Sequence, residues 1–240
     1  MRLTRISQIG CGKKHVKIRD VFRKQAKYFD ALKKGVLMTT KKRILDEALT
    51  LFAEKGYGNV YVAQIAEAVG IKAPSLYKHY KSKQDIFNAI LEEMKVGYDK
   101  QAGSLHMNGS DVQEDAGIFA KVSEEELVKM GMGLFTYFLH DTYACRFRKM
   151  LTLEQFQNEE LAHLFSKQYV DEPLSYQGAI FGMLCAGGVF KAEETDVMAL
   201  EFYAPLYFLL ILCDRQPKRE AEALALLERH IRQFGRIYRA

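Results

Sequence analysis

Apolar residues recur every three or four positions over residues 40–94, in short runs that glycine and proline separate. This spacing is typical of short amphipathic helices. The first run is preceded by Thr39 and Thr40, either of which can cap a helix start. It places five side chains on one helix face: Ile44, Leu45, Ala48, Leu51 and Phe52. Gly56 and Gly58 then predict the end of this first helix.

Two further short helices are expected after it. Val62, Ile65, Ala66 and Val69 predict a second helix that ends at Gly70, because glycine readily takes a positive φ. Pro74 suits the first turn of a third helix. In that helix Leu76 and Tyr80 face inward, and the outward side chains are those of Ser75, Lys78 and His79.

A fourth helix is predicted to begin after Ser82, which can cap it. Its apolar stripe consists of Ile86, Phe87, Ile90, Leu91 and Met94. A short helix, a glycine turn and a second short helix are typical of a helix-turn-helix, whose second helix fits a DNA major groove roughly 12 Å wide. Periodicity alone leaves an ordinary helical bundle as the alternative.

Three stretches are more specific than this periodicity. They are LDEALTLFAEKGY at 45–57, IAEAVGI at 65–71 and LYKHYKSK at 76–83. They closely resemble the N-terminal domain of TetR-family (tetracycline-repressor-like) transcriptional regulators, over residues 40–94. The resemblance implies an all-α protein with a three-helix helix-turn-helix DNA-binding domain at 38–84 and a helical ligand-binding and dimerisation domain at 85–240.

The resemblance also implies which side chains meet DNA. Residues 73–80 correspond to the recognition helix, and Tyr77 and Lys83 take the positions that usually grip phosphates; a phenol and an ammonium both donate to phosphate oxygens. Around them, Lys72, Ala73, Ser75 and Lys78 are placed for base edges. A solvated surface position is the alternative for each of these four. His79 either contacts phosphate or caps and packs locally.

Two positions depart from the family pattern. A small hydroxyl residue usually opens the second helix, but Val60 and Tyr61 stand here. Tyr61 cannot cap, although its hydroxyl can reach the DNA backbone, and Asn59 is a candidate cap. Lys72 replaces the usual serine, which affects the base contacts more than the fold.

The positive charge lies mainly at the N-terminus. Residues 1–37 hold 11 Lys/Arg and 2 Asp/Glu, a balance of +9, which leaves 24 basic and 28 acidic residues, −4, for 38–240. Residues 1–37 are either a basic arm that follows the DNA backbone or a translated extension upstream of a true start at Met38.

Composition bounds the remaining possibilities. Hydrophobic residues make up 48% of the 240 positions, and the four cysteines form no zinc-ligand pattern. No signal peptide is evident. We therefore expect a cytoplasmic protein without metal or cofactor. An enzyme is disfavoured, because no nucleophile, base and orienter can be assembled, whereas an all-helical interaction module without DNA binding stays an alternative.

The C-terminal part is expected to be helical after a loop at 103–117, rich in Gly, Ser, Asn and Asp. Ser123 and Glu126 form a capping box that starts a helix to about His140. Further helices are expected at 142–157, from Asn158, and from Pro173 to Gly187 and Gly188.

The expected ligand is a small, mainly apolar effector of unknown identity. Phe135, Phe138, Met150 and Tyr176 are the candidate lining residues. Methionine and aromatic residues at helical spacing more often fill a core. That is the alternative for all four.

Residues 197–213 are nearly all apolar, with Glu201 and Pro205 inside, and predict a largely buried helix rather than a membrane span. A heptad-like helix follows them. We expect this hairpin to form a homodimer interface, built from Tyr203, Tyr207, Leu224, Leu227, Ile231 and Phe234. A hairpin that serves only the core of one chain is the alternative.

Overall fold

The computed structural model describes residues 38–104 and 111–240, so both readings of the leader at 1–37 lie outside the described residues. Arg43–Ala240 forms one compact unit, which holds nearly all of the described residues. Within the described ranges the regular elements are helices, with one isolated bridge between Phe190 and Arg239. The predicted all-α fold is confirmed.

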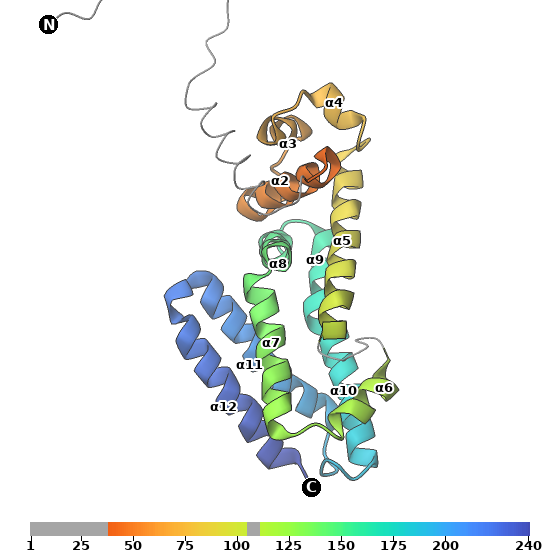
Figure 1. The fold of residues 1–240 in the computed structure, drawn as a ribbon, viewed down its shortest axis with the longest axis vertical. Helices are drawn as coiled ribbons and strands as arrows, with labels where there is room; N and C mark the ends of the chain where they lie inside the picture. The colour runs from red at the N-terminus through yellow and green to blue at the C-terminus, as the bar shows by residue number, and fades with distance from the viewer. Residues whose placement is uncertain (1–37, 105–110) are drawn as a thin grey trace, which may run out of the picture. The chain divides into compact units, whose positions relative to one another are not determined.

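The first helices follow the sequence closely. They are α2 (Thr40–Lys55), α3 (Val62–Val69), α4 (Ala73–Tyr77) and α5 (Lys83–Ser104) (Figure 1). Thr39 Oγ1 accepts the Lys42 N–H at 3.3 Å, and Ser82 Oγ accepts the Asp85 N–H at 3.0 Å. Such caps satisfy amides that the first turn of a helix leaves without partners. Both predicted caps are confirmed.

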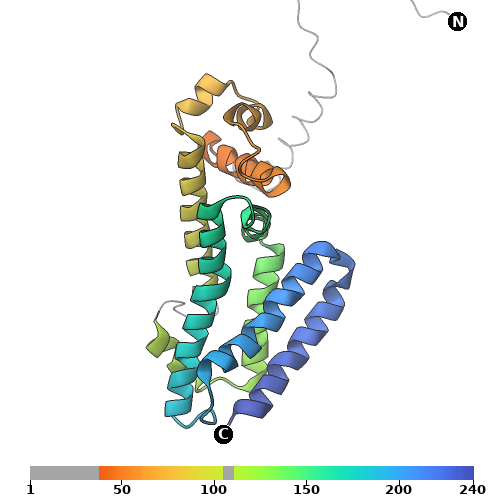
Figure 2. The same ribbon diagram turned by 180° about the vertical axis from the view of Figure 1, so that it is seen from behind.

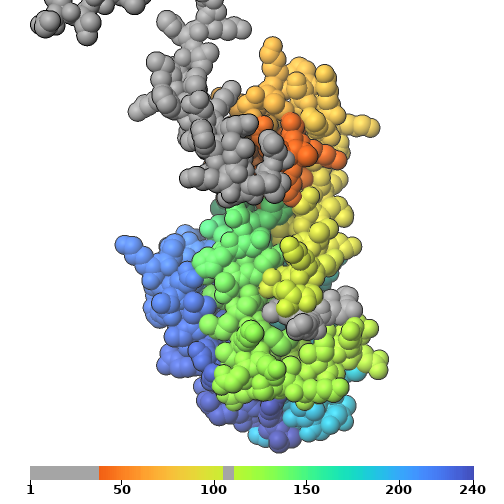
Figure 3. Space-filling model, in the orientation of Figure 1, coloured from red at the N-terminus to blue at the C-terminus, as the bar shows by residue number. Residues whose placement is uncertain are grey.

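The remaining helices form the C-terminal part. They are α6 (Val112–Phe119), α7 (Glu124–His140), α8 (Thr142–Glu154), α9 (Glu159–Ser166), the π-helical segment η1 (Lys167–Asp171), α10 (Glu172–Ala186), α11 (Thr195–Arg215), the 3₁₀ turn η2 (Pro217–Arg219) and α12 (Glu220–Tyr238). Helix α11 packs against both α10 and α12, and α12 also packs along α7 (Figures 1 and 2). Figure 3 shows side chains filling the space between α7 and α12.

The expected loop at 103–117 is wrong at both ends. Helix α5 continues to Ser104, and α6 begins at Val112. Asp111 caps α6 by accepting the N–H groups of Gln113 and Glu114, each at 3.0 Å. Polar composition suggested a loop, but a capping aspartate and a buried Ala116 are enough to form this short helix.

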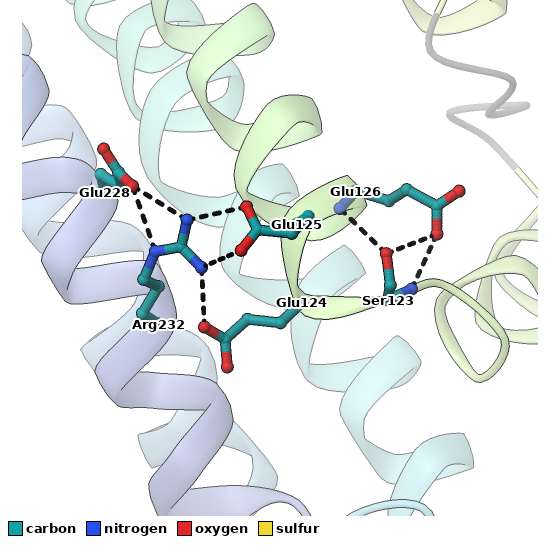
Figure 4. Close-up of polar contacts among 6 residues, drawn as sticks. All are labelled: Ser123, Glu124, Glu125, Glu126, Glu228 and Arg232. Carbon is teal, nitrogen blue, oxygen red and sulfur yellow. Dashed lines mark hydrogen bonds and ion pairs between the residues drawn. The ribbon is translucent and has the colours of Figure 1, made fainter.

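The start of α7 has the predicted capping box (Figure 4). Ser123 Oγ accepts the Glu126 N–H at 3.2 Å, and Glu126 Oε2 accepts the Ser123 N–H at 2.8 Å. Two further carboxylates of this turn, those of Glu124 and Glu125, bind Arg232 of α12. The polar turn therefore also fastens α7 to the C-terminal helix.

Candidate nucleic-acid interface

The turn between α3 and α4 sets the position of α4. Gly70 has φ 78° and ψ 33°, and its N–H donates to the Glu67 carbonyl at 3.0 Å. The following N–H, of Ile71, donates to Ala66 O at 2.9 Å. This left-handed ending reverses the chain within three residues, because glycine takes a positive φ without steric cost. The predicted helix-turn-helix is present in the structure.

Helix α4 presents one buried and one exposed side. Leu76 and Tyr80 are buried in the core, as predicted. The side chains of Lys72, Tyr77, Lys78 and His79 are exposed, and those of Ser75 and Ala73 are half-buried. Residues 68–84 contain four lysines and no Asp or Glu. This end of the domain is therefore a small basic surface of exposed hydrogen-bond donors.

Tyr61 stands at the N-cap of α3 with its ring 71% exposed. Its side chain makes no capping bond, as expected; instead Gln64 Oε1 accepts the Tyr61 N–H at 2.8 Å. The prediction that Asn59 caps α3 is wrong, because its Nδ2 donates to the Lys55 carbonyl at 2.9 Å and the N-cap residue is Tyr61. Because capping does not occupy the Tyr61 hydroxyl, it stays available to a ligand.

Lys83 differs from the other lysines of this surface. Its Nζ donates to the carbonyls of Tyr57 at 2.8 Å and Val60 at 3.1 Å, and lies 4.2 Å from the centre of the Tyr57 ring. Burial lowers the pKa of this ammonium, and Glu154 acts in the opposite direction. In the structure Lys83 thus ties the start of α5 to the loop between α2 and α3. A phosphate contact by its remaining donor stays a prediction.

Sequence reasoning missed the role of Tyr57. Its ring packs against Phe52 and Phe87 at centroid distances of 5.1 and 5.2 Å, and its hydroxyl donates to Gln84 Oε1 at 2.9 Å. An aromatic residue between two turn glycines was the available signal. The ring anchors the loop that leads into α3.

Helix α8 is attached to the helix-turn-helix at two points. Arg146 Nη1 donates to Asp46 Oδ1 of α2 at 2.8 Å. The nearly buried Glu154 accepts the Gly58 N–H at 3.3 Å, and a Cβ placed on Gly56 would lie 2.5 Å from its Oε1. Nothing in the sequence indicated these contacts, because the partners lie about a hundred positions apart.

The four candidate ligand residues are not brought together. Met150 belongs to the core cluster of α2–α5 and α8, Phe135 to a cluster with α11 and α12, and Tyr176 to a third cluster. Phe138 touches the first two clusters. Tyr176 also donates its hydroxyl to the buried Asp115, which, after burial, raises the pKa of the phenol. A pocket lined by all four is not evident in the described residues.

The candidate dimer residues of α12 need correction. Leu227, Ile231 and Phe234 are buried inside the chain's own core, so they leave no surface for a partner. Leu224 is half-buried in the same core, and Tyr203 and Tyr207 of α11 face inward. The heptad-like seam packs against α7 and α11 rather than against a second chain.

The exposed apolar face lies on α11 instead. Its members follow helical spacing: Val197, Leu200, Ala204, Phe208 and Ile211. Phe208 alone is 67% exposed. We call these five residues the α11 face. Helix α11 is long and apolar enough to cross a membrane by length and composition alone, which is weak evidence because core helices pass the same test.

Comparison with known proteins bears on this geometry. Residues 44–90, which span α2 to the middle of α5, match the family described as bacterial regulatory proteins, tetR family. We call residues 44–90 the TetR domain, after the family that this segment resembles. Sequence similarity covers the TetR domain, whereas similarity of fold extends over most of the chain.

Two curated relatives match a short part of the chain. The negative transcriptional regulator IcaR of the biofilm operon icaADBC in Staphylococcus epidermidis is 44% identical over 52 residues, 22% of this chain and 28% of the relative. The protein of the same name in Staphylococcus aureus is 40% identical over 68 residues, 28% of this chain and 35% of the relative. The matched segment thus spans about a third of those proteins.

Solved structures match most of the chain in fold. A putative TetR-family regulator from Mesorhizobium loti has a TM-score of 0.61 at 15% identity, covering 84% of this chain and 97% of its own. SmeT, the repressor of a Stenotrophomonas maltophilia multidrug efflux pump, has 0.57 at 15% identity, with 85% and 92% covered. A putative regulator from Saccharomonospora viridis in complex with choline has 0.56 at 22%, with 81% and 94% covered. These likenesses place the C-terminal helices in the same fold.

Residues 38–104 and 111–240 contain no group of three or more His, Cys, Asp or Glu side chains arranged to hold a metal ion. Cys145, Cys185 and Cys213 are free thiols. The expectation of no cofactor stays a prediction.

Proposed function

We propose that this chain is a ligand-responsive transcriptional repressor that binds a palindromic operator as a homodimer in the cytoplasm. The carrying observation is the basic surface of α4, in a domain whose sequence matches TetR-family regulators. The structural neighbours include the repressor SmeT, which is also known in complex with triclosan, and a putative regulator in complex with choline, which supports control by a small effector.

DNA contact is proposed for the exposed end of the TetR domain. Tyr77 and Tyr61 carry hydroxyls that can donate to phosphate oxygens and fix the register of the protein on the duplex. Lys72, Lys78, Ser75 and Ala73 line the side of α4 that would enter the major groove. His79 is exposed beside them and is assigned a phosphate contact.

The homodimer is proposed to form through the α11 face. Five apolar residues at helical spacing on one exposed face are unusual for a helix in contact with water only. A second copy related by a two-fold axis would cover this face with its own. Two-fold symmetry also matches a palindromic operator, whose half-sites lie about 34–36 Å apart per helical turn.

No enzymatic or membrane role is assigned. The proposed activity needs binding alone. A membrane-inserted α11 is the competing explanation of the α11 face, and it predicts detergent-dependent solubility rather than a defined dimer in buffer.

A mobility shift with the DNA upstream of the chain's own gene tests this function. Wild-type protein should bind at low salt, and Tyr77→Phe should weaken binding while leaving the helical circular dichroism unchanged. Lys100→Ala, a change of an exposed lysine near the far end of α5, is the matched control and should bind like wild type. Equal binding of all three proteins to any DNA, or no binding at low salt, would favour the interaction module without a DNA role.

A further inference from the structure

A buried arginine of the C-terminal part lacks hydrogen-bond acceptors. Arg148 of α8 is 1% exposed, and its Nη2 donates to Asp214 Oδ1 at 3.0 Å. Its Nε and Nη1 have no partner among the described residues. Burying the N–H donors of a guanidinium without hydrogen-bond partners costs folding free energy, because water no longer solvates them. An acceptor from outside these residues would remove that cost.

The local charge also favours an anion. Asp214 receives a second cation, Lys149, whose Nζ lies 3.6 Å from the same oxygen that Arg148 binds. Two cations thus share one carboxylate. Buried charges are stable when each is paired and hydrogen-bonded, so an anion at the open nitrogens of Arg148 would complete the pairing.

Three tyrosines, Tyr169, Tyr203 and Tyr207, lie within electrostatic reach of Arg148 and belong to a group of packed aromatic rings. The rings of Phe165 and Tyr169 lie 5.7 Å apart, those of Tyr169 and Tyr207 6.0 Å apart, and Tyr203 stacks on Tyr207 at 6.2 Å. Thr152, one turn beyond Arg148, lies between the two groups: its hydroxyl donates to the Arg148 carbonyl at 2.8 Å, and its side chain acts on the pKa of the Tyr207 phenol. We call Arg148, Phe165, Tyr169, Tyr203 and Tyr207 the Arg148 cluster.

Tyr169 supplies a second polar atom without a partner. Its ring is 4% exposed and its hydroxyl has no partner among the described residues. Burial raises the pKa of this phenol, while the Arg148 charge acts to lower it, so the two side chains are within electrostatic reach. The hydroxyl therefore stays protonated and can donate. Tyr203 is different, because its hydroxyl already donates to the Tyr169 carbonyl at 3.0 Å.

We propose that the Arg148 cluster binds a small aromatic carboxylate, and that this class of molecule is the effector of the function proposed above, on which the second part rests. A planar carboxylate matches the planar guanidinium and accepts two of its N–H groups. A planar ring fits among aromatic side chains in offset or edge contacts. The effector is thus anionic at one end, unlike the mainly apolar molecule expected from the sequence.

Benzoate is the smallest probe of this class, and benzamide is its neutral equivalent of the same shape. The unfolding temperature of the full chain should rise when benzoate is added and should not rise when benzamide is added at the same ionic strength. Arg148→Met should weaken benzoate binding by about tenfold or more, the value of one charge-assisted hydrogen bond. Equal shifts with both probes, or no shift with benzoate, would overturn the proposal.

Tyr169→Phe guards against a variant that simply fails to fold. It removes a hydroxyl without a partner, so the free protein should unfold at an unchanged or higher temperature while benzoate binds more weakly. Tyr203→Phe is the matched comparison. The Tyr203 hydroxyl already donates to the Tyr169 carbonyl, so its loss should lower the unfolding temperature of the protein measured in the absence of benzoate. A Tyr169→Phe variant that binds benzoate like wild type would also contradict the assignment.

This test separates failure of the site from failure of the proposed function, because binding of benzoate is measured without DNA. Benzoate binding by a protein that never binds its upstream DNA would leave the ligand site standing and remove the repressor. DNA binding that persists in Arg148→Met, with benzoate without effect on wild type, would keep the DNA role and remove this site.

Discussion

The helix-turn-helix and the C-terminal part distribute polar and apolar side chains in opposite ways. In α2–α4 the buried side chains are apolar or aromatic, and lysines cover the exposed end. In the C-terminal part Asp115, Arg148 and Glu154 are buried, while the α11 face is exposed. The first arrangement suits a polyanion at the surface. The second suits a polar ligand inside and a second chain outside.

The largest expected effect comes from charging the α11 face. Phe208→Glu should convert a homodimer into a monomer, because a carboxylate at the centre of an apolar interface loses its hydration without a partner. Light scattering after size exclusion measures the mass. Operator affinity should fall by about a hundredfold or more, since the two half-sites are then no longer bound together.

Phe156→Glu is the matched control for this change. Phe156 is also largely exposed, but it follows the end of α8 and lies outside the α11 face. Its replacement should leave the mass unchanged. A dimer that survives Phe208→Glu, or a monomeric wild type, would contradict the assignment of the α11 face.

The basic surface of α4 can be tested through its salt dependence. Lys78→Ala should lower DNA affinity on the order of tenfold and reduce the slope of log affinity against log salt by about 1, because one phosphate counterion fewer is released. A loss confined to one operator sequence, with an unchanged slope, would instead indicate a base contact. Titrations at several salt concentrations distinguish the two.

The boundary between the two regions can be tested at Gly56. Its φ is 84°, and an added Cβ would meet Glu154 Oε1, so Gly56→Ala should destabilise the fold by about 1–3 kcal/mol. Gly58→Ala has open space and no positive φ, so it should stay within about 0.5 kcal/mol of wild type. Urea denaturation compares them. Equal losses at both positions would show that the Glu154 contact does not form.

The smallest effect concerns acid. Binding to Arg232 lowers the pKa of Glu125 from its usual 4.5, so its stabilising contribution is complete above that pH and is lost as the pH falls through the lower, folded value. The stability difference between wild type and Arg232→Gln should therefore shrink below about pH 4.5. The neighbouring exposed Arg229→Gln should show no such trend in denaturation midpoints. A difference that stays constant in acid would exclude this ion pair.

The sequence was sufficient for the helix-turn-helix because its information is local. Gly70, Pro74 and Ser82 each act within one turn of the chain, and Leu76 and Tyr80 face the core through simple periodicity. The loop at 103–117 failed for a local reason too. A polar composition does not distinguish a loop from a capped helix with one small buried face.

The C-terminal part was less predictable because its interior depends on distant partners. The heptad-like spacing of Leu227 and Ile231 correctly predicts a packed helix face, but spacing cannot tell whether α7 or a second chain covers that face. Arg148 carried no signal at all, since a lone arginine on a helix is usually solvated. Its burial and its ion pair with Asp214 of α11 appear only in the folded structure.

Helix α8 carries Arg146 and Glu154, which contact the helix-turn-helix domain, and also Arg148, which belongs to the Arg148 cluster. One rigid element of 13 residues is thus shared by both proposed binding events. Thermodynamic linkage then requires reciprocity: whatever factor the ligand removes from DNA affinity, bound DNA removes from ligand affinity. A repressor bound to its operator would therefore bind the effector more weakly than the free protein does. Its release from DNA would then need a higher effector concentration than the one that half-saturates the free protein.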